Sequence, residues 1–84
     1  MNHYFYLARC SDNSLYSGYT INIKEREKAH NEGRGAKYTK ARLPVKIVYY
    51  ERFRSKTKAL KREAEVKRCS KAMKEELVNV TIRP

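Results

Sequence analysis

The sequence places opposite charges on the apolar sides of two predicted helices. Arg26 and His30 lie one turn apart on the apolar side of a helix over residues 23–31, and Glu63 has the same position in a helix over 56–68. The residues that share its side are Ala59, Leu60, Val66 and Lys67. An ionised group turned toward an interior costs several kcal/mol unless it is paired or binds a metal. Two interpretations follow: a structural Arg26–Glu63 ion pair, or a site for phosphodiester chemistry.

The second interpretation gives each residue type a role. A carboxylate such as Glu63 can hold Mg²⁺, which polarises a phosphate and stabilises the leaving oxygen. A guanidinium such as that of Arg26 binds phosphate through paired hydrogen bonds. The attacking water needs a base, and His30 or a tyrosine can accept its proton. The candidate tyrosines are Tyr4, Tyr6, Tyr16 and Tyr19. Packing is the alternative role for a tyrosine on a strand, and periodicity does not rank the four.

These side chains must be positioned by an α+β fold. Alternating aromatic and apolar residues, turn residues at 11–14 and helix-capping residues at Asn22, Ser55 and Ser70 predict the elements. They are strands over 3–9, 15–20 and 45–53, and helices over 23–31, 56–68 and 71–77, with a basic loop over 36–42 and no assignment for 78–84. The prediction is one α+β layer, a small sheet with helices against it, in the order ββαβαα. We expect one domain over residues 1–84.

The first two strands form a predicted hairpin with a geometric difficulty. A regular four-residue connection over 11–14 pairs Cys10 with Leu15, and Tyr6 and Tyr16 then point to opposite faces because side chains alternate. A site that uses both tyrosines needs one extra residue. The sequence therefore predicts a β-bulge at or near Asp12–Ser14, or a site at the sheet edge reached from both faces.

The charge of the chain favours a polyanionic partner. Lys and Arg number 20 against 9 Asp and Glu, a net charge of +11 on 84 residues, and residues 1–22 contribute none of the excess. A solvated basic face is the alternative to a binding surface. Tyrosine interleaved with cations favours nucleic acid, because cations neutralise phosphates and tyrosine stacks on bases. The candidate nucleic-acid-binding residues are Arg34, Lys37, Tyr38, Lys40 and Arg42.

Two further classes of protein are disfavoured. No apolar run reaches the ~18 residues of a membrane span, and the N-terminus lacks a signal-peptide pattern, so we expect a soluble, cytoplasmic protein without a membrane partner. Cys10 and Cys69 form no CxxC pair. Together with His3 and His30 they make four residues of types that can bind zinc, but their spacing matches no zinc finger or ribbon. We therefore expect both cysteines to be ordinary thiols.

Several short segments in one order resemble the GIY-YIG nuclease domain. They are Tyr4-Phe5-Tyr6, Tyr16-Ser17-Gly18, Arg26 and Ala59-Leu60-Lys61-Arg62-Glu63. The resemblance is closest to the small stand-alone bacterial branch of that superfamily, through segments such as Gly35-Ala36-Lys37-Tyr38-Thr39, and it covers residues 4–75. Tyr4 replaces the first glycine and Ser17 the isoleucine of the name motifs, and neither position carries the chemistry. The resemblance implies a small three-stranded antiparallel sheet flanked by helices, which agrees with the elements predicted from the residues.

The resemblance also ranks the candidates. It implies that Tyr6 is the base for the attacking water and that the Tyr16 hydroxyl lies near that water and the phosphate. It makes Arg26 the clamp on the scissile phosphate, and Glu63 the single carboxylate ligand of a divalent metal, Mg²⁺ or Mn²⁺. Gly18 is the close-packing glycine, and His30 assists proton transfer.

The function implied is that of a metal-dependent DNA endonuclease, structure-selective or related to repair. Many family members carry a separate DNA-binding domain, so target choice is here expected to come from the basic surface, DNA shape or a protein partner. A nucleic-acid-binding module without useful catalysis, or with partner-dependent catalysis, is the main alternative. A basic RNA- or ribosome-associated protein is the other, but it leaves Glu63 on the apolar stripe unexplained, and DNA is expected rather than RNA.

Overall fold

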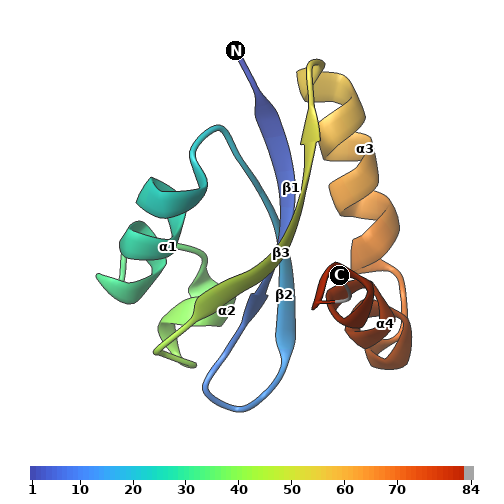
Figure 1. Ribbon diagram of the computed structural model, residues 1–84. Coiled ribbons are helices and arrows are strands. Elements are labelled where there is room, and N and C mark those ends of the chain that lie inside the picture. Colours follow the sequence, from blue (N-terminus) through green and yellow to red (C-terminus); the bar gives the residue numbers. More distant parts are fainter. Residues whose placement is uncertain (83–84) are drawn as a thin grey trace.

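A three-stranded antiparallel sheet lies between two layers of helices, α1 and α2 on one face and α3 and α4 on the other (Figure 1). The computed structural model describes residues 1–82. The elements are β1 (His3–Arg9), β2 (Leu15–Thr20), α1 (Ile23–Asn31), α2 (Lys37–Lys40), β3 (Lys46–Phe53), α3 (Lys56–Lys67) and α4 (Lys71–Ile82). None of the described helices is long and apolar enough to cross a membrane. The predicted α+β class and antiparallel sheet are confirmed.

Strand β1 is the middle strand, in the order β2-β1-β3, and its alternating side chains divide the interior into two cores. Phe5 and Leu7 point toward α3 and α4, whereas Tyr6 and Ala8 point toward α1. The buried residues of the first core are Phe5, Leu7, Leu15, Val66 and Val78; those of the second are Tyr6, Ala8, Cys10 and Val45. One face of β1 therefore presents Tyr6 to the helix that carries Arg26 and His30.

The predicted helix caps are present. The Asn22 side chain accepts a hydrogen bond from the Glu25 amide at 3.0 Å, and Ser55 accepts one from the Lys58 amide at 3.3 Å. Gly33 has a φ of +80°, a conformation that glycine adopts readily, and turns the chain after α1. These local signals explain why the bounds of α1 and α3 follow the sequence closely.

Two stretches differ from the expectation. Residues 36–42 contain the single turn of α2 rather than only a loop, closed by a 3.1 Å bond from the Lys40 amide to the Ala36 carbonyl. One helical turn is too short to leave a period in the sequence. The last helix, expected to end near Leu77, continues to Ile82 and takes in most of the unassigned tail; residues 83–84 lie outside the described residues.

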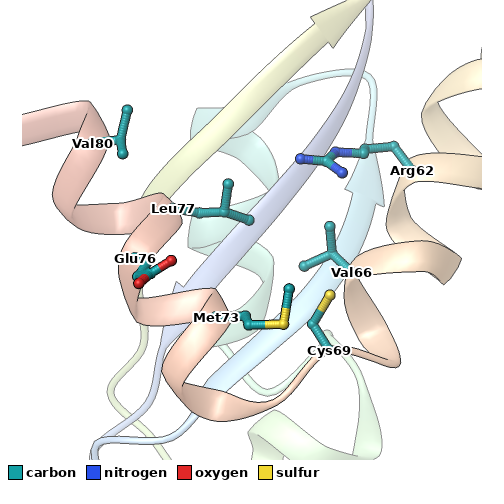
Figure 2. A pocket seen from close by; sticks show the side chains of 7 residues that line it. All are labelled: Arg62, Val66, Cys69, Met73, Glu76, Leu77 and Val80. Atoms are coloured by element: carbon teal, nitrogen blue, oxygen red, sulfur yellow. The ribbon is translucent and has the colours of Figure 1, made fainter.

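A groove of about 210 Å³ opens between α3 and α4 on the face of the sheet opposite Tyr6 (Figure 2). Figure 2 shows Val66 of α3 and Cys69 of the connection that follows it facing Met73 and Leu77 of α4. Its lining is mostly apolar and it contains none of the residues to which chemistry was assigned above. The groove is therefore separate from the site described below.

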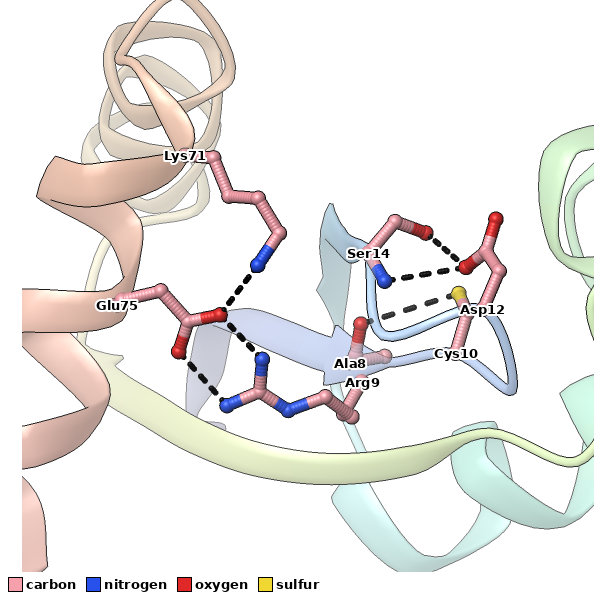
Figure 3. A network of polar contacts seen from close by, with 7 residues as sticks. All are labelled: Ala8, Arg9, Cys10, Asp12, Ser14, Lys71 and Glu75. Atoms are coloured by element: carbon pink, nitrogen blue, oxygen red, sulfur yellow. Dashed lines mark hydrogen bonds and ion pairs between the residues drawn. The ribbon is translucent and has the colours of Figure 1, made fainter.

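The hairpin connection has three residues, Ser11 to Asn13, and not the four of the regular connection that would place Tyr6 and Tyr16 on opposite faces. The Cys10 amide donates to the Ser14 carbonyl, the Asn13 amide donates to the Cys10 carbonyl, both at 2.9 Å, and Asn13 has a φ of 69°. A turn followed by a left-handed residue is a G1 bulge, the feature predicted for this segment. An Asp12 carboxylate oxygen braces it by accepting from the Ser14 amide at 3.1 Å (Figure 3).

This connection changes the faces on which the two tyrosines lie. Ala8 pairs with Tyr16, and Tyr6 pairs with Gly18. Because Tyr6 and Ala8 are two residues apart on β1, their side chains share a face, and Tyr16 shares it with them. Both tyrosines therefore point toward the α1 side of the sheet.

An ion pair joins β1 to α4 across the molecule. The Arg9 guanidinium contacts both carboxylate oxygens of Glu75, with Nη2 2.8 Å from Oε1, and Lys71 Nζ lies 2.7 Å from Oε2 (Figure 3). These two cations, Arg9 first, lower the pKa of Glu75 from 4.5 to about 2. The folded state therefore favours the ionised form of the Glu75 carboxylate.

Glu75→Gln is expected to lower the free energy of unfolding by about 0.5–1 kcal/mol near neutral pH, because the pair is partly exposed and screened. The folded-state pKa is depressed, so this stabilisation is present above pH 4.5 and is lost as the pH falls toward about 2. Urea unfolding of wild type and variant across that range measures it, with Glu76→Gln as the control. A difference between wild type and variant that stays constant from pH 7 to pH 2 contradicts this assignment.

Candidate active site

The Tyr6 hydroxyl is the centre of a hydrogen-bonded cluster between β1 and α1. Its oxygen lies 2.7 Å from His30 Nε2 and accepts a hydrogen bond from Arg26 Nε at 3.2 Å. Tyr6 and His30 are fully buried, and Arg26 is half-buried. Helix α1 places Arg26 and His30 one turn apart over the face of β1 that carries Tyr6. Arg26 and His30, predicted to share the apolar side of this helix, thus both hydrogen-bond to the Tyr6 hydroxyl.

The hydrogen bonds around His30 define its tautomer. The Thr39 hydroxyl donates its one proton to the Ala36 carbonyl at 2.9 Å, so it can only accept from His30 Nδ1, which lies 2.8 Å away. Neutral His30 therefore carries its proton on Nδ1 and leaves Nε2 as an acceptor. It follows that Tyr6 donates its hydroxyl proton to His30, while its oxygen accepts from Arg26.

The burial of this pair shifts both of its titrations. Burial raises the pKa of Tyr6 to about 12, Tyr16 and Glu63 add smaller shifts in the same direction, and Arg26 opposes them. Burial also lowers the pKa of His30 below 6.5, and the neighbouring charge of Arg26 lowers it further. At neutral pH the phenol and the imidazole are both uncharged, so the proton of the Tyr6 hydroxyl has an unprotonated acceptor beside it.

Two glycines let the cluster close up. A Cβ atom added at Gly18 lies 2.4 Å from both Cζ and the hydroxyl oxygen of Tyr6, and one added at Gly35 lies 2.1 Å from His30 Nδ1. Real Cβ contacts essentially never fall below 3.0 Å. Gly18 and Gly35 therefore face the two ends of the Tyr6–His30 pair at distances that no other residue allows.

Glu63 and Tyr16 complete the cluster at the β2 edge of the sheet. The Ser17 hydroxyl donates to the Glu63 carbonyl at 3.1 Å, which holds α3 against β2. The Glu63 side chain is 18% exposed, and its Oε2 lies 3.1 Å from Lys67 Nζ. The Tyr16 ring lies 6.4 Å from the Tyr6 ring and 5.7 Å from that of His30, between centroids. The β2 edge thus exposes a carboxylate beside the buried pair.

The Arg26–Glu63 ion pair, one of the two interpretations of the sequence, is not formed. Within the described residues, Arg26 bonds to the Tyr6 hydroxyl, whereas Glu63 pairs with Lys67 on the next turn of α3. The two charges therefore take part in one cluster without neutralising each other.

The donor set suits a hard cation held by one protein carboxylate. No group of three or more His, Cys, Asp and Glu side chains capable of holding a metal occurs within the described residues. Mg²⁺ commonly takes one or two carboxylates and completes its coordination with water and substrate phosphates. Glu63 fits that mode, whereas a protein-enclosed zinc site does not form. Cys10 and Cys69 are free thiols, and His30 is fully used by Tyr6 and Thr39.

The five residues predicted to bind nucleic acid separate into two groups. The Arg42 guanidinium lies 3.8 Å above the Tyr38 ring and pairs with Asp12 at 3.0 Å, and Tyr38 stacks on Tyr16 with centroids 5.9 Å apart. Tyr38 and Arg42 thus adjoin the cluster. Of the other three, Lys37 and Lys40 are exposed on α2, and Arg34 pairs with Glu32 before that helix.

Reasoning from the sequence missed Thr39, Gly35 and Lys67 as parts of the site. Thr39 lies in the basic loop over 36–42 and Gly35 directly precedes it. No periodicity there marks the residues that face inward, and Thr39 is fully buried. The sequence places Lys67 on the same side of α3 as Glu63 and four residues after it. This spacing could have predicted the ion pair between them.

Comparison with known proteins places this geometry in a family. The model of the GIY-YIG catalytic domain matches residues 2–76. UPF0213 protein SH2523 of Staphylococcus haemolyticus is 51% identical over 76 residues, covering 90% of this chain and 93% of that protein. UPF0213 protein NP_0776A of Natronomonas pharaonis is 51% identical over 77 residues, covering 92% and 91%.

A solved structure agrees with the sequence comparison. The solution NMR structure of UPF0213 protein BH0048 from Bacillus halodurans has a TM-score of 0.63 and 45% identity, covering all of this chain and 89% of that one. The family model, these relatives and the shared fold agree, and the chain belongs to the GIY-YIG family.

Proposed function

We propose that the protein is a divalent-metal-dependent DNA endonuclease that hydrolyses phosphodiester bonds. The observation that carries the proposal is the Tyr6 hydroxyl, held between the Arg26 guanidinium and Nε2 of His30. Structure-selective cleavage connected with DNA repair in the cytoplasm, with target choice made by the basic surface or by a protein partner, is the context that we infer for it.

Proton transfer in this proposal runs from water through Tyr6 to His30. As the water oxygen bonds to phosphorus, the Tyr6 oxygen takes one water proton and its own hydroxyl proton passes to His30 Nε2. His30 becomes an imidazolium that still donates from Nδ1 to Thr39. The bond from phosphorus to the leaving oxygen breaks. Tyr6 thus remains neutral throughout, which is consistent with its raised pKa.

The charged groups of the cluster act on the phosphate. Arg26 uses Nε on Tyr6, so its terminal nitrogens are available to bind the scissile phosphate and stabilise the charge that develops there. The Glu63 carboxylate would hold the divalent cation, Mg²⁺ or Mn²⁺, and the cation would polarise the phosphate and stabilise the leaving oxygen. The Tyr16 hydroxyl is assigned to the same phosphate and the attacking water.

A DNA-binding module without catalysis on the same scaffold is the second candidate, and the full burial of Tyr6 favours it. Water reaches the Tyr6 oxygen only if a side chain that covers it moves when substrate binds. Cleavage by purified protein separates the two functions.

The test is cleavage of labelled branched, nicked and linear DNA with Mg²⁺ or Mn²⁺. We expect at least one substrate to be cut, no cleavage in EDTA, and a loss of about 10²-fold or more in Arg26→Ala, because the phosphate loses its charged donor. Arg26→Ala carried through the same purification also controls for contaminating nucleases. The absence of metal-dependent cleavage on every substrate, or equal activity in Arg26→Ala, would leave only the binding module.

A further inference from the structure

A groove of about 360 Å³ begins directly beside the catalytic cluster. It is lined by Leu15, Tyr16, Ser17, Tyr38, Lys67 and Lys74, which come from β2, α2, α3 and α4. Four elements far apart in the sequence thus meet at the β2 edge. Of these six residues, only Tyr16 and Tyr38 were assigned a role in binding or chemistry from the sequence.

Tyr16 is the wall shared by the groove and the cluster. On one side its ring contacts the rings of Tyr6 and His30, with centroids 6.4 and 5.7 Å away. On the other side it stacks on Tyr38 with an interplanar angle of 23°. The Arg42 guanidinium covers Tyr38 at 3.8 Å, so the aromatic wall is held on both sides. A chain bound in the groove therefore continues into the site assigned to the scissile phosphate.

Two lysines line the groove beside this aromatic wall. Lys67 Nζ lies 5.5 Å from the Tyr16 centroid while it pairs with Glu63. Lys74 lies half-buried on α4, and its ammonium is paired with no carboxylate within the described part of the chain. An apolar and aromatic lining beside two lysines, one of them without a paired carboxylate among the described residues, matches a nucleotide, which has a flat base and an anionic phosphate.

We propose that this groove binds the nucleotide adjacent to the scissile phosphate, with its phosphate on Lys74 and Lys67 and its sugar or base against Leu15 and Tyr38. The proposal rests on the proposed function for the position of the scissile phosphate. The volume of the groove lies at the lower end of the range for small-molecule sites, enough for one nucleotide. Lys74 is then a substrate-positioning residue that no motif of the sequence indicates.

The first experiment maps the binding of a 5′-phosphorylated thymidine dinucleotide to ¹⁵N-labelled wild-type protein by NMR in EDTA. We expect saturable shifts of the amide signals of Leu15, Ser17, Tyr38 and Lys74. Lys74→Met is expected to weaken binding by about 3- to 10-fold and to reduce its salt dependence, because one phosphate contact is lost. Lys61→Met, an exposed lysine of α3 outside the groove, is the control of equal charge change and should bind as wild type does.

Signals that shift elsewhere, the absence of saturable binding, or equal losses in Lys74→Met and Lys61→Met would overturn the groove assignment. The assay contains no metal and measures no cleavage, so its outcome is independent of catalysis. If the dinucleotide binds in the groove but the protein cleaves no DNA, the nucleotide site is supported and the nuclease activity is rejected. If the protein cleaves DNA but the dinucleotide does not bind in the groove, only the nucleotide site is rejected.

Discussion

Tyr6→Phe is expected to slow DNA cleavage by about 10²- to 10⁴-fold, the usual contribution of a general base. The variant keeps the ring and its packing but removes the oxygen that joins Arg26 to His30. It also leaves the buried His30 Nε2 without a partner, which is expected to lower the free energy of unfolding by about 1–3 kcal/mol. Single-turnover cleavage and urea unfolding measure the two effects.

Tyr4→Phe is the matched control, because Tyr4 lies two residues away on the same face of β1 and packs edge-on against Tyr50. Tyr4→Phe should cleave within about twofold of wild type, a change too small to involve the chemical step. A Tyr6→Phe variant that cleaves as fast as Tyr4→Phe contradicts the assignment of Tyr6 as the base.

Gly18→Ala is expected to lower the free energy of unfolding by about 1–3 kcal/mol or more, because the new methyl group overlaps the Tyr6 ring. The ring is fully buried and is held by Arg26 and His30, so it has little room to move. Displacing it also breaks the bond to His30, and cleavage should fall with stability.

A double-mutant cycle tests whether the overlap is the cause. In a Tyr6→Leu background the ring is absent, so Gly18→Ala should cost less than half of its effect in wild type. An equal loss of stability in both backgrounds would mean that the glycine acts through the backbone of β2, and not through the approach to Tyr6.

Local signals in the sequence account for most of the fold. Alternation in 3–9 and 15–20 and the caps at Asn22 and Ser55 act within a few residues, and the corresponding elements are where they were predicted. The apolar stripe that contains Arg26 and His30 is also a local property, and it brings both onto Tyr6. A β-bulge in the hairpin was one of the two arrangements predicted by requiring Tyr6 and Tyr16 to share one site.

The parts that the sequence did not predict depend on contacts between distant segments. Thr39 faces His30 only because α2 folds back under α1, and a four-residue helix has no stripe from which to infer this. Arg26 contacts Tyr6, and Glu63 contacts Lys67, in place of the Arg26–Glu63 pair. Which of these contacts form depends on how α1, α3 and the sheet pack.

Glu63→Gln provides the most direct test of the proposed nuclease activity. We expect cleavage with Mg²⁺ or Mn²⁺ to fall by about 10³-fold, because the single carboxylate that holds the cation is lost, while DNA affinity measured in EDTA stays within about twofold. Glu65→Gln removes a carboxylate from the exposed side of the same helix and should cleave as wild type does. Cleavage by Glu63→Gln at the wild-type rate would contradict the proposed function.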